Sequence, residues 1–156
     1  MNDRVPEELA GYESELAEVE RRVERRIDPG NTAVVVALGA LLLGVAYLLT
    51  WTGSARGWEI LIGEQSYGLL PRLFAVTAVA FGLLGSMLAL ATRWWALAWL
   101  CALGCGFSIV DGIWAIWSRQ VTVPIGGSGP GVGLVLGVLA VAVLTVCWVR
   151  IALRRA

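Results

Sequence analysis

The sequence contains neither histidine nor lysine, so all twelve of its basic residues are arginine. The lack of histidine excludes histidine-ligated haem, the commonest zinc sites and histidine as a general base. The three cysteines, Cys101, Cys105 and Cys147, lie within long apolar runs, which excludes a disulfide-stapled secreted scaffold and favours a packing role. We therefore predict no catalytic residue, no metal site and no cofactor.

Charge is scarce over most of the chain. Of the 156 residues, 58% are hydrophobic and 15% are charged, and nine of the twelve acidic residues fall within the first 28 positions. Beyond them only Glu59, Glu64 and Asp111 are acidic. This uneven distribution divides the chain into a charged segment, residues 1–30, and an apolar domain, residues 31–156.

Four long apolar stretches make up most of the second part. The first, residues 32–51, holds no charged residue over 20 positions, and a helix of that length rises about 30 Å, the thickness of a bilayer's hydrocarbon core. Similar stretches cover about residues 73–91, 94–117 and 131–149. The pattern predicts an all-α fold, a four-transmembrane-helix bundle preceded by an N-terminal amphipathic cytoplasmic helix.

Arginine and tryptophan give the predicted bundle a direction. With four spans, nine arginines fall on the side of the two termini and three on the other side, and cytoplasmic segments are the ones enriched in basic residues. Tryptophan prefers the interface, and it marks the outer one at Trp51, Trp58, Trp114 and Trp117 and the inner one at Trp94, Trp95 and Trp148. We therefore predict a multi-pass protein of the cell membrane, with both termini cytoplasmic and the lipid bilayer around it.

An apolar stripe runs along the charged N-terminal segment. Its members recur every three or four residues, close to a heptad repeat: Leu9, Tyr12, Leu16, Val19, Val23 and Ile27. The stripe predicts binding to another membrane protein or to a second copy of the chain. Alternatively the segment is partly disordered, or lies on the inner leaflet, where four arginines meet anionic lipid: Arg21, Arg22, Arg25 and Arg26.

Asp111 is the one acidic residue inside a predicted span. A carboxylate at the centre of a bilayer costs about 2.5 to 3.5 kcal/mol on insertion scales, so it is a candidate functional site by default. We expect Arg72, at the outer end of the neighbouring span, to pair with it, and Ser108 to share its helical face. Three interpretations stay open: a structural hydrogen bond or ion pair, a proton or cation site, and a contact with a partner subunit.

Four short stretches carry a resemblance to other proteins. They are WTG at 51–53, GWEIL at 57–61, PRLFA at 71–75 and WAIWSRQ at 114–120. They resemble a group of uncharacterised, small four-helix integral membrane proteins of actinobacteria, and the similarity covers residues 30–155. The resemblance implies the topology given above and no particular activity.

These features predict a non-catalytic membrane accessory or scaffolding protein, a subunit of a larger actinobacterial respiratory or cell-envelope complex. Such a protein is not an enzyme and binds no nucleic acid. The alternative is a small proton-coupled transporter that uses Asp111, although the exporters it resembles rely on a glutamate in the first span, which here has no charge. An enzyme acting on lipid is disfavoured, because no cluster of acids, bases or nucleophiles occurs at either membrane face.

Overall fold

The structure, a computed structural model, describes residue 27 and residues 30–63, 68–122 and 129–154. Its helices are α2 (Thr32–Leu48), α3 (Gly57–Ile62), α4 (Leu69–Thr77), the π-helix η1 (Ala78–Gly85), α5 (Ser86–Thr92), α6 (Trp95–Thr122) and α7 (Val132–Leu153). A two-stranded antiparallel hairpin, β1 (Thr50–Thr52) and β2 (Ala55–Arg56), separates α2 from α3. The prediction of an all-α fold class is confirmed, with this hairpin as a small addition.

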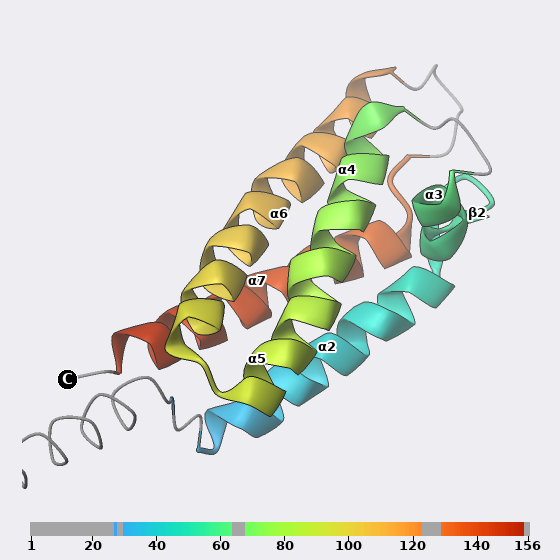
Figure 1. The fold of residues 1–156 in the computed structure, drawn as a ribbon. Helices are drawn as coiled ribbons and strands as arrows, with labels where there is room; N and C mark the ends of the chain where they lie inside the picture. The colour runs from blue at the N-terminus through green and yellow to red at the C-terminus, as the bar shows by residue number, and fades with distance from the viewer. Residues whose placement is uncertain (1–26, 28–29, 64–67, 123–128, 155–156) are drawn as a thin grey trace, which may run out of the picture.

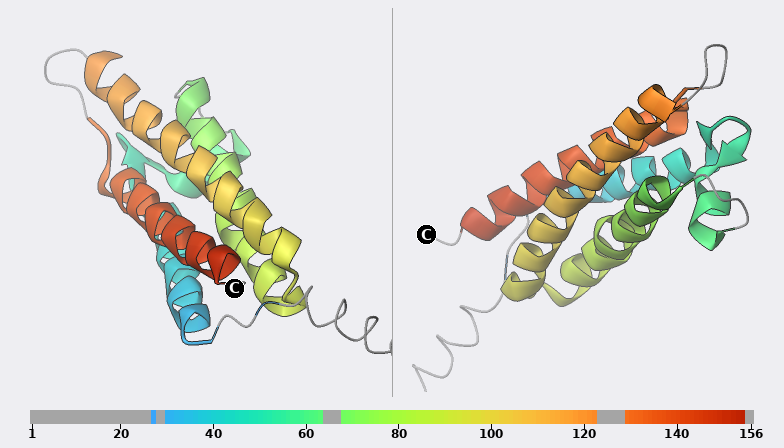
Figure 2. Two further views of the ribbon diagram at one scale, coloured as in Figure 1. Left: turned by 90° about the vertical axis from the view of Figure 1, so that its left-hand side faces the viewer. Right: turned by 90° about the horizontal axis from the view of Figure 1, so that it is seen from above.

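The long helices form four rods that pack together (Figure 1). α4, η1 and α5 follow one another without a break and make a single rod. α7 packs against both α2 and α6, and α4 packs against α6. The hairpin and α3 lie at one end of this body, and the turn from α5 to α6 lies at the other end (Figure 2).

Local sequence explains where the rods begin and end. Pro71 stands in the first turn of α4, where its missing N–H has no helical partner to lose. α5 ends at Thr92, and the next residue, Arg93, has a φ of 55°, the left-handed conformation that closes many helices and that glycine usually supplies. The rods are built mostly of Ala, Leu, Val and Gly, and α6 carries the single described acid within them, Asp111.

An aromatic cluster fills the core near the hairpin. Trp51 is fully buried, with ring centroids 4.8 Å from Tyr47 and 5.3 Å from Phe74. Its indole N–H donates to the Ala46 carbonyl at 2.7 Å, and the Tyr47 hydroxyl donates to the Ala75 carbonyl at 2.6 Å. These bonds satisfy the polar atoms that burial would otherwise leave without water.

The hairpin changes the expected end of the first apolar stretch. The prediction placed a helix over residues 32–51, but α2 ends at Leu48 and Thr50 begins a strand. The strand reaches across the chain, because Thr52 pairs with Pro130 and the Gly131 N–H donates to the Trp51 carbonyl at 2.7 Å. β1 therefore connects the end of α2 to the start of α7.

The outward surface of the rods is largely apolar. Each rod exposes large hydrophobic side chains, with Leu41 66%, Leu84 62%, Leu103 67% and Leu139 58% exposed. By length and composition alone, three helical stretches could cross a membrane: Leu69–Thr92, Trp95–Val121 and Val132–Leu153. The fourth, Thr32–Leu48, is shorter. The predicted bundle of four transmembrane helices is therefore not supported as such.

Candidate functional site

Asp111 lies in the interface between α6 and α4, with 7% of its surface exposed. The Thr77 hydroxyl donates to its Oδ2 at 3.5 Å, which is long for a hydrogen bond to a carboxylate. Burial raises the pKa of the Asp111 carboxyl, and the bond from Thr77 lowers it by a smaller amount. The carboxyl is thus held by one weak contact in surroundings that favour its protonated form.

Arg72 is the partner that the sequence predicted for Asp111. Its guanidinium carbon lies 3.3 Å from the place that a Cβ on Gly63 would occupy, at the end of α3. Thr77, five residues further along α4, is the residue that faces Asp111. Those five residues correspond to a rise of about 7.5 Å, so the arginine stands well beyond the carboxyl along the rod. The side chain that the structure places against the Asp111 carboxyl is therefore that of Thr77, while the expected pairing with Arg72 stays a prediction.

Ser108 shares the face of α6 on which Asp111 lies, three residues earlier. It is fully buried, and its hydroxyl has no hydrogen-bond partner within the described part of the chain. A buried hydroxyl without a partner costs roughly 1 to 3 kcal/mol. Asp111, Thr77 and Ser108 make a small polar strip, but this strip has no nucleophile paired with a base.

A second polar contact, between α7 and the π-helical rod, was not predicted. The Trp148 indole N–H donates to the Ser86 hydroxyl at 2.9 Å, and that hydroxyl donates to the Phe81 carbonyl at 3.4 Å. Phe81 and Ser86 stand five residues apart, which is the spacing of a π-helix. The sequence does not predict this contact, because its periodicity does not distinguish a π-helix from an α-helix. Gly82 and Gly85, within the π-helical segment, fit an ordinary helix equally well.

The thiols are poorly suited to nucleophilic chemistry. Cys101 and Cys105 are buried, and burial raises the pKa of Cys101 to about 11 and that of Cys105 to about 12, with the neighbouring Cys101 adding to the latter shift. The thiolate is the reactive form, so both are protonated near neutral pH. Within residues 30–63, 68–122 and 129–154, no three Cys, Asp or Glu side chains come together as metal ligands.

The predicted partner-binding and lipid-binding residues fall almost wholly outside the described residues. This applies to Leu9, Tyr12, Leu16, Val19 and Val23 of the stripe and to Arg21, Arg22, Arg25 and Arg26 of the basic cluster. Ile27 is described: it is buried, and its N–H donates to the Arg93 carbonyl at 2.9 Å. This end of the stripe therefore packs on its own chain.

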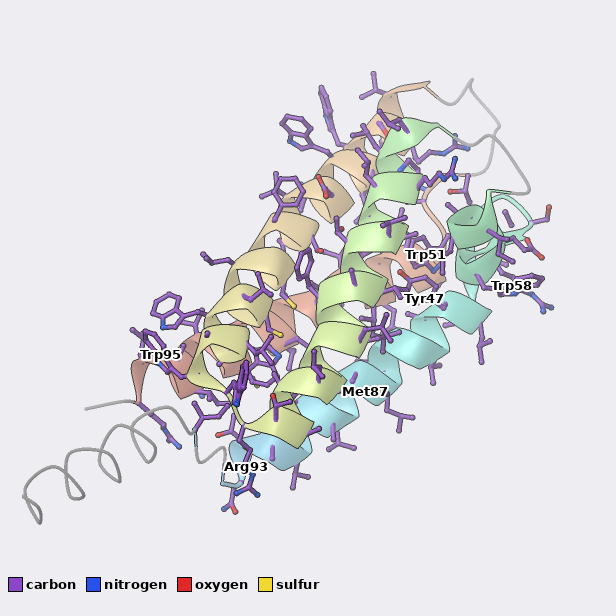
Figure 3. The ribbon with its side chains drawn as sticks, viewed as in Figure 1. Tyr47, Trp51, Trp58, Met87, Arg93 and Trp95 are labelled. Atoms are coloured by element: carbon purple, nitrogen blue, oxygen red, sulfur yellow. The ribbon has the colours of Figure 1, made fainter. Side chains whose placement is uncertain are left out.

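Basic and aromatic side chains gather at the end of the body where α6 begins and α7 ends. The Trp95 indole N–H donates to the Ala152 carbonyl at 3.2 Å, which brings the two helix ends together. Arg93, Trp94, Arg150 and Arg154 surround this contact in the sequence, and all four are exposed. Figure 3 shows Arg93 and Trp95 at this end, far from Trp58 in α3.

Comparisons with known proteins give two matches. The family model described as "MiaB C-terminal domain" matches residues 13–156. A tRNA-2-methylthio-N(6)-dimethylallyladenosine synthase of Mycobacterium avium (strain 104) is 41% identical over 148 residues, which cover 92% of this chain and 21% of that enzyme. The chain thus spans about a fifth of the length of this relative. No solved structure matches this chain.

These matches overturn the resemblance to uncharacterised membrane proteins and the function drawn from it. The relative is named as an enzyme, so the predictions of a non-catalytic accessory or scaffolding protein, of an Asp111-dependent transporter and of no enzymatic role are wrong. Composition could not reveal this family relationship, because apolar runs reflect hydrophobicity and do not identify a family. Four fifths of the relative's sequence also has no counterpart in this chain.

The predicted partners and location are corrected on the same ground. The relative's name specifies transfer RNA, which contradicts the expectation of no nucleic acid. Hydropathy and arginine counts had predicted a bilayer and membrane proteins as partners, and a multi-pass position in the cell membrane with cytoplasmic termini. The family match overturns both predictions. What remains is an observation of length and composition: three helices could cross a membrane.

Proposed function

The chain belongs to the MiaB C-terminal domain family, and from this premise we propose that it serves as the C-terminal helical region of a tRNA-modifying enzyme. The modification is the one in the relative's name, synthesis of 2-methylthio-N6-dimethylallyladenosine in transfer RNA. The observation that carries the proposal is the identity of 41% sustained over 92% of the chain. A match of that extent covers the helical body as a whole.

The helical region contributes binding and packing surfaces to this enzyme. Support comes from the described residues, where the thiols have a raised pKa and no group of metal ligands gathers. Methylthiolation requires a source of sulfur and of a methyl group, and the chain covers only 21% of the relative. The reacting groups accordingly belong to the part of the enzyme that has no counterpart in this chain.

The apolar outer surface supports an association role. Leu103 and Phe107, one turn apart on α6, are 67% and 60% exposed, and Leu41 on α2 is 66% exposed. Extensive exposed apolar surface is typical of places where another surface is bound. In the proposed enzyme, the remaining four fifths of the protein supply that second surface.

A gene deletion with nucleoside analysis tests the proposal. The segment that encodes this chain is removed in its own organism, and transfer RNA is digested and analysed by mass spectrometry. We expect the ratio of 2-methylthio-N6-dimethylallyladenosine to N6-dimethylallyladenosine to fall at least tenfold, and to recover when the chain is expressed again.

An inactive and an active control accompany the complementation. Gly112→Leu places a large side chain where even a Cβ lies 2.5 Å from Val138, so it should fail to restore the ratio. Gly106→Ala meets no atom within 4 Å and should restore it. An unchanged ratio of the two nucleosides after the deletion would overturn the proposal. The case against it would be strongest if the purified chain also floated with lipid vesicles and bound no part of the tRNA-modifying enzyme.

A further inference from the structure

The end of the body where α6 begins and α7 ends has the chemistry of a surface for nucleic acid. We propose that the Arg–Trp end, defined as Arg93, Trp94, Arg150 and Arg154, binds transfer RNA, with the guanidinium groups on phosphates and the Trp94 ring under an unstacked base. This inference rests on the proposed function and adds to it the place of contact.

Two helix ends are joined to make this surface. The bond from the Trp95 indole to the Ala152 carbonyl, 3.2 Å long, fixes the first turn of α6 against the last turn of α7. Arg93 and Trp94 directly precede that turn of α6, and Arg150 and Arg154 flank Ala152. The four residues therefore come from segments more than fifty positions apart, and the bond between Trp95 and Ala152 brings these segments to one end of the molecule.

The charge at this end is of one sign among the described residues. Arg93, Arg150 and Arg154 are exposed, and the two described acids lie elsewhere: Glu59 in α3, at the opposite end, and Asp111 about 24 Å along α6 from its start. Three exposed cations, with no carboxylate beside them among the described residues, attract the phosphates of an RNA backbone. Arginine also presents a planar fork of donors that suits phosphate oxygens.

The two neighbouring tryptophans have different roles. Trp95 uses its indole N–H to hold α7. Trp94 is 62% exposed, although an indole is among the largest apolar side chains. An exposed aromatic ring beside arginine is the arrangement on which single-stranded bases stack.

The backbone at Arg93 agrees with a binding role for its side chain. Arg93 holds a φ of 55°, and no other non-glycine residue of the described chain has a positive φ. Glycine takes this conformation without steric cost, whereas a residue with a Cβ is strained there. A charged side chain is thus presented at a position where the fold alone favours glycine.

Fluorescence anisotropy with the full chain tests the proposal. The probe is a fluorescein-labelled transfer RNA that bears N6-dimethylallyladenosine, titrated at several salt concentrations. We expect the triple variant Arg93→Gln, Arg150→Gln, Arg154→Gln to raise the Kd roughly tenfold to a hundredfold at 0.1 M salt, and to reduce the slope of log Kd against log salt by about two. Trp94→Ala should raise the Kd roughly fivefold to a hundredfold without changing that slope.

The opposite end of the molecule supplies matched controls. Arg56 and Arg72 are exposed arginines there, and Trp117 is 64% exposed, almost the same as Trp94. We expect Arg56→Gln with Arg72→Gln, and Trp117→Ala, to leave the Kd within twofold of the wild type. Equal losses at both ends would overturn the Arg–Trp end as the site.

Anionic vesicles of phosphatidylglycerol distinguish RNA phosphate from lipid phosphate. If the triple variant loses vesicle binding while its affinity for transfer RNA is unchanged, the inference is refuted. A wild-type chain that binds the probe, with variants that bind equally well, refutes the Arg–Trp end and leaves the proposed function standing. Loss of the modified nucleoside on gene deletion is measured independently, so the two proposals fail separately.

Discussion

Gly112 offers a direct test of how closely α6 packs. A Cβ at this position lies 2.5 Å from Cγ2 of Val138 on α7, and 3.0 Å and 3.1 Å from two ring atoms of Phe74 on α4. Carbon atoms in favourable contact are about 3.5 to 4.0 Å apart, so the methyl group of Gly112→Ala is roughly 1 Å too close to a stiff, β-branched side chain. Phe74 is fully buried.

The cost of this substitution follows from two opposing effects. Alanine favours the helix over glycine by about 1 kcal/mol, whereas overpacking of this kind costs about 1 to 3 kcal/mol. Gly106→Ala, on the same helix, meets no atom within 4 Å and keeps only the favourable effect. We expect the two variants to differ by about 1 to 3 kcal/mol, or roughly 2 to 12 °C in Tm.

Thermal unfolding followed by circular dichroism measures this difference. Val138→Ala removes the clashing methyl groups, so Gly112→Ala should cost less in that background than in the wild type. This coupling separates a steric clash from a general effect of alanine on α6. Equal Tm values for Gly112→Ala and Gly106→Ala, or the absence of coupling to Val138, would refute the packing described here.

Three further predictions concern the buried polar groups. Ser86→Ala removes the acceptor of the buried Trp148 indole N–H and should destabilise the fold by about 1 to 3 kcal/mol. Ser108→Ala removes a hydroxyl that has no partner within the described chain and should be neutral or stabilising. The reverse result in thermal unfolding, with Ser86→Ala neutral or stabilising and Ser108→Ala destabilising, would contradict both assignments. The folded pKa of Asp111 is raised, so its contribution to stability is present below the ordinary carboxyl pKa and is lost as the pH rises through the folded pKa. Asp111→Asn should therefore be more stable than the wild type at neutral pH and should lose this advantage in acid. Stability profiles of the two proteins that run parallel against pH would contradict the raised pKa. Cys105, with a pKa raised to about 12, should react with iodoacetamide at pH 8 only after unfolding, as measured by mass spectrometry, and rapid labelling of the folded chain would show that the thiol is accessible.

The helices could be foreseen because the physical signal is strong. Runs of about twenty residues that are mostly apolar and nearly free of charge favour a helix, and α6 and α7 follow the predicted stretches closely. The end of α2 could not be foreseen, because the run stays uncharged through Trp51 while the backbone changes from helix to strand at Thr50. Apolarity alone does not distinguish the two conformations.

Tryptophan placement shows a second limit of single-sequence reasoning. Interfacial preference predicted Trp51 and Trp148 at a boundary, but both are fully buried, where each indole N–H meets a partner inside the fold. Trp114 and Trp117 are exposed, at 58% and 64%. The same residue type serves the core and the surface, and only the tertiary contacts decide which.

The candidate site was the least predictable part. Asp111 and Ser108 are both buried on α6, but charge complementarity favoured Arg72 as the partner of the carboxyl, and the short side chain of Thr77 was not considered. Membership of the MiaB C-terminal domain family could not be inferred at all. It rests on the similarity of whole aligned stretches, 148 residues in the case of the relative, and no single residue among them indicates it by its chemistry.

The strand β1 has a consequence for how far relatives can diverge. The contact that fixes the start of α7 runs between main-chain atoms, from the Gly131 N–H to the Trp51 carbonyl, so it does not depend on which side chains the strand carries. Substitutions can accumulate over the outward faces while this end of the body keeps its register. Gly131 is an exception: a Cβ there would overlap the Thr50 carbonyl, so tolerance to mutation should drop sharply at this position.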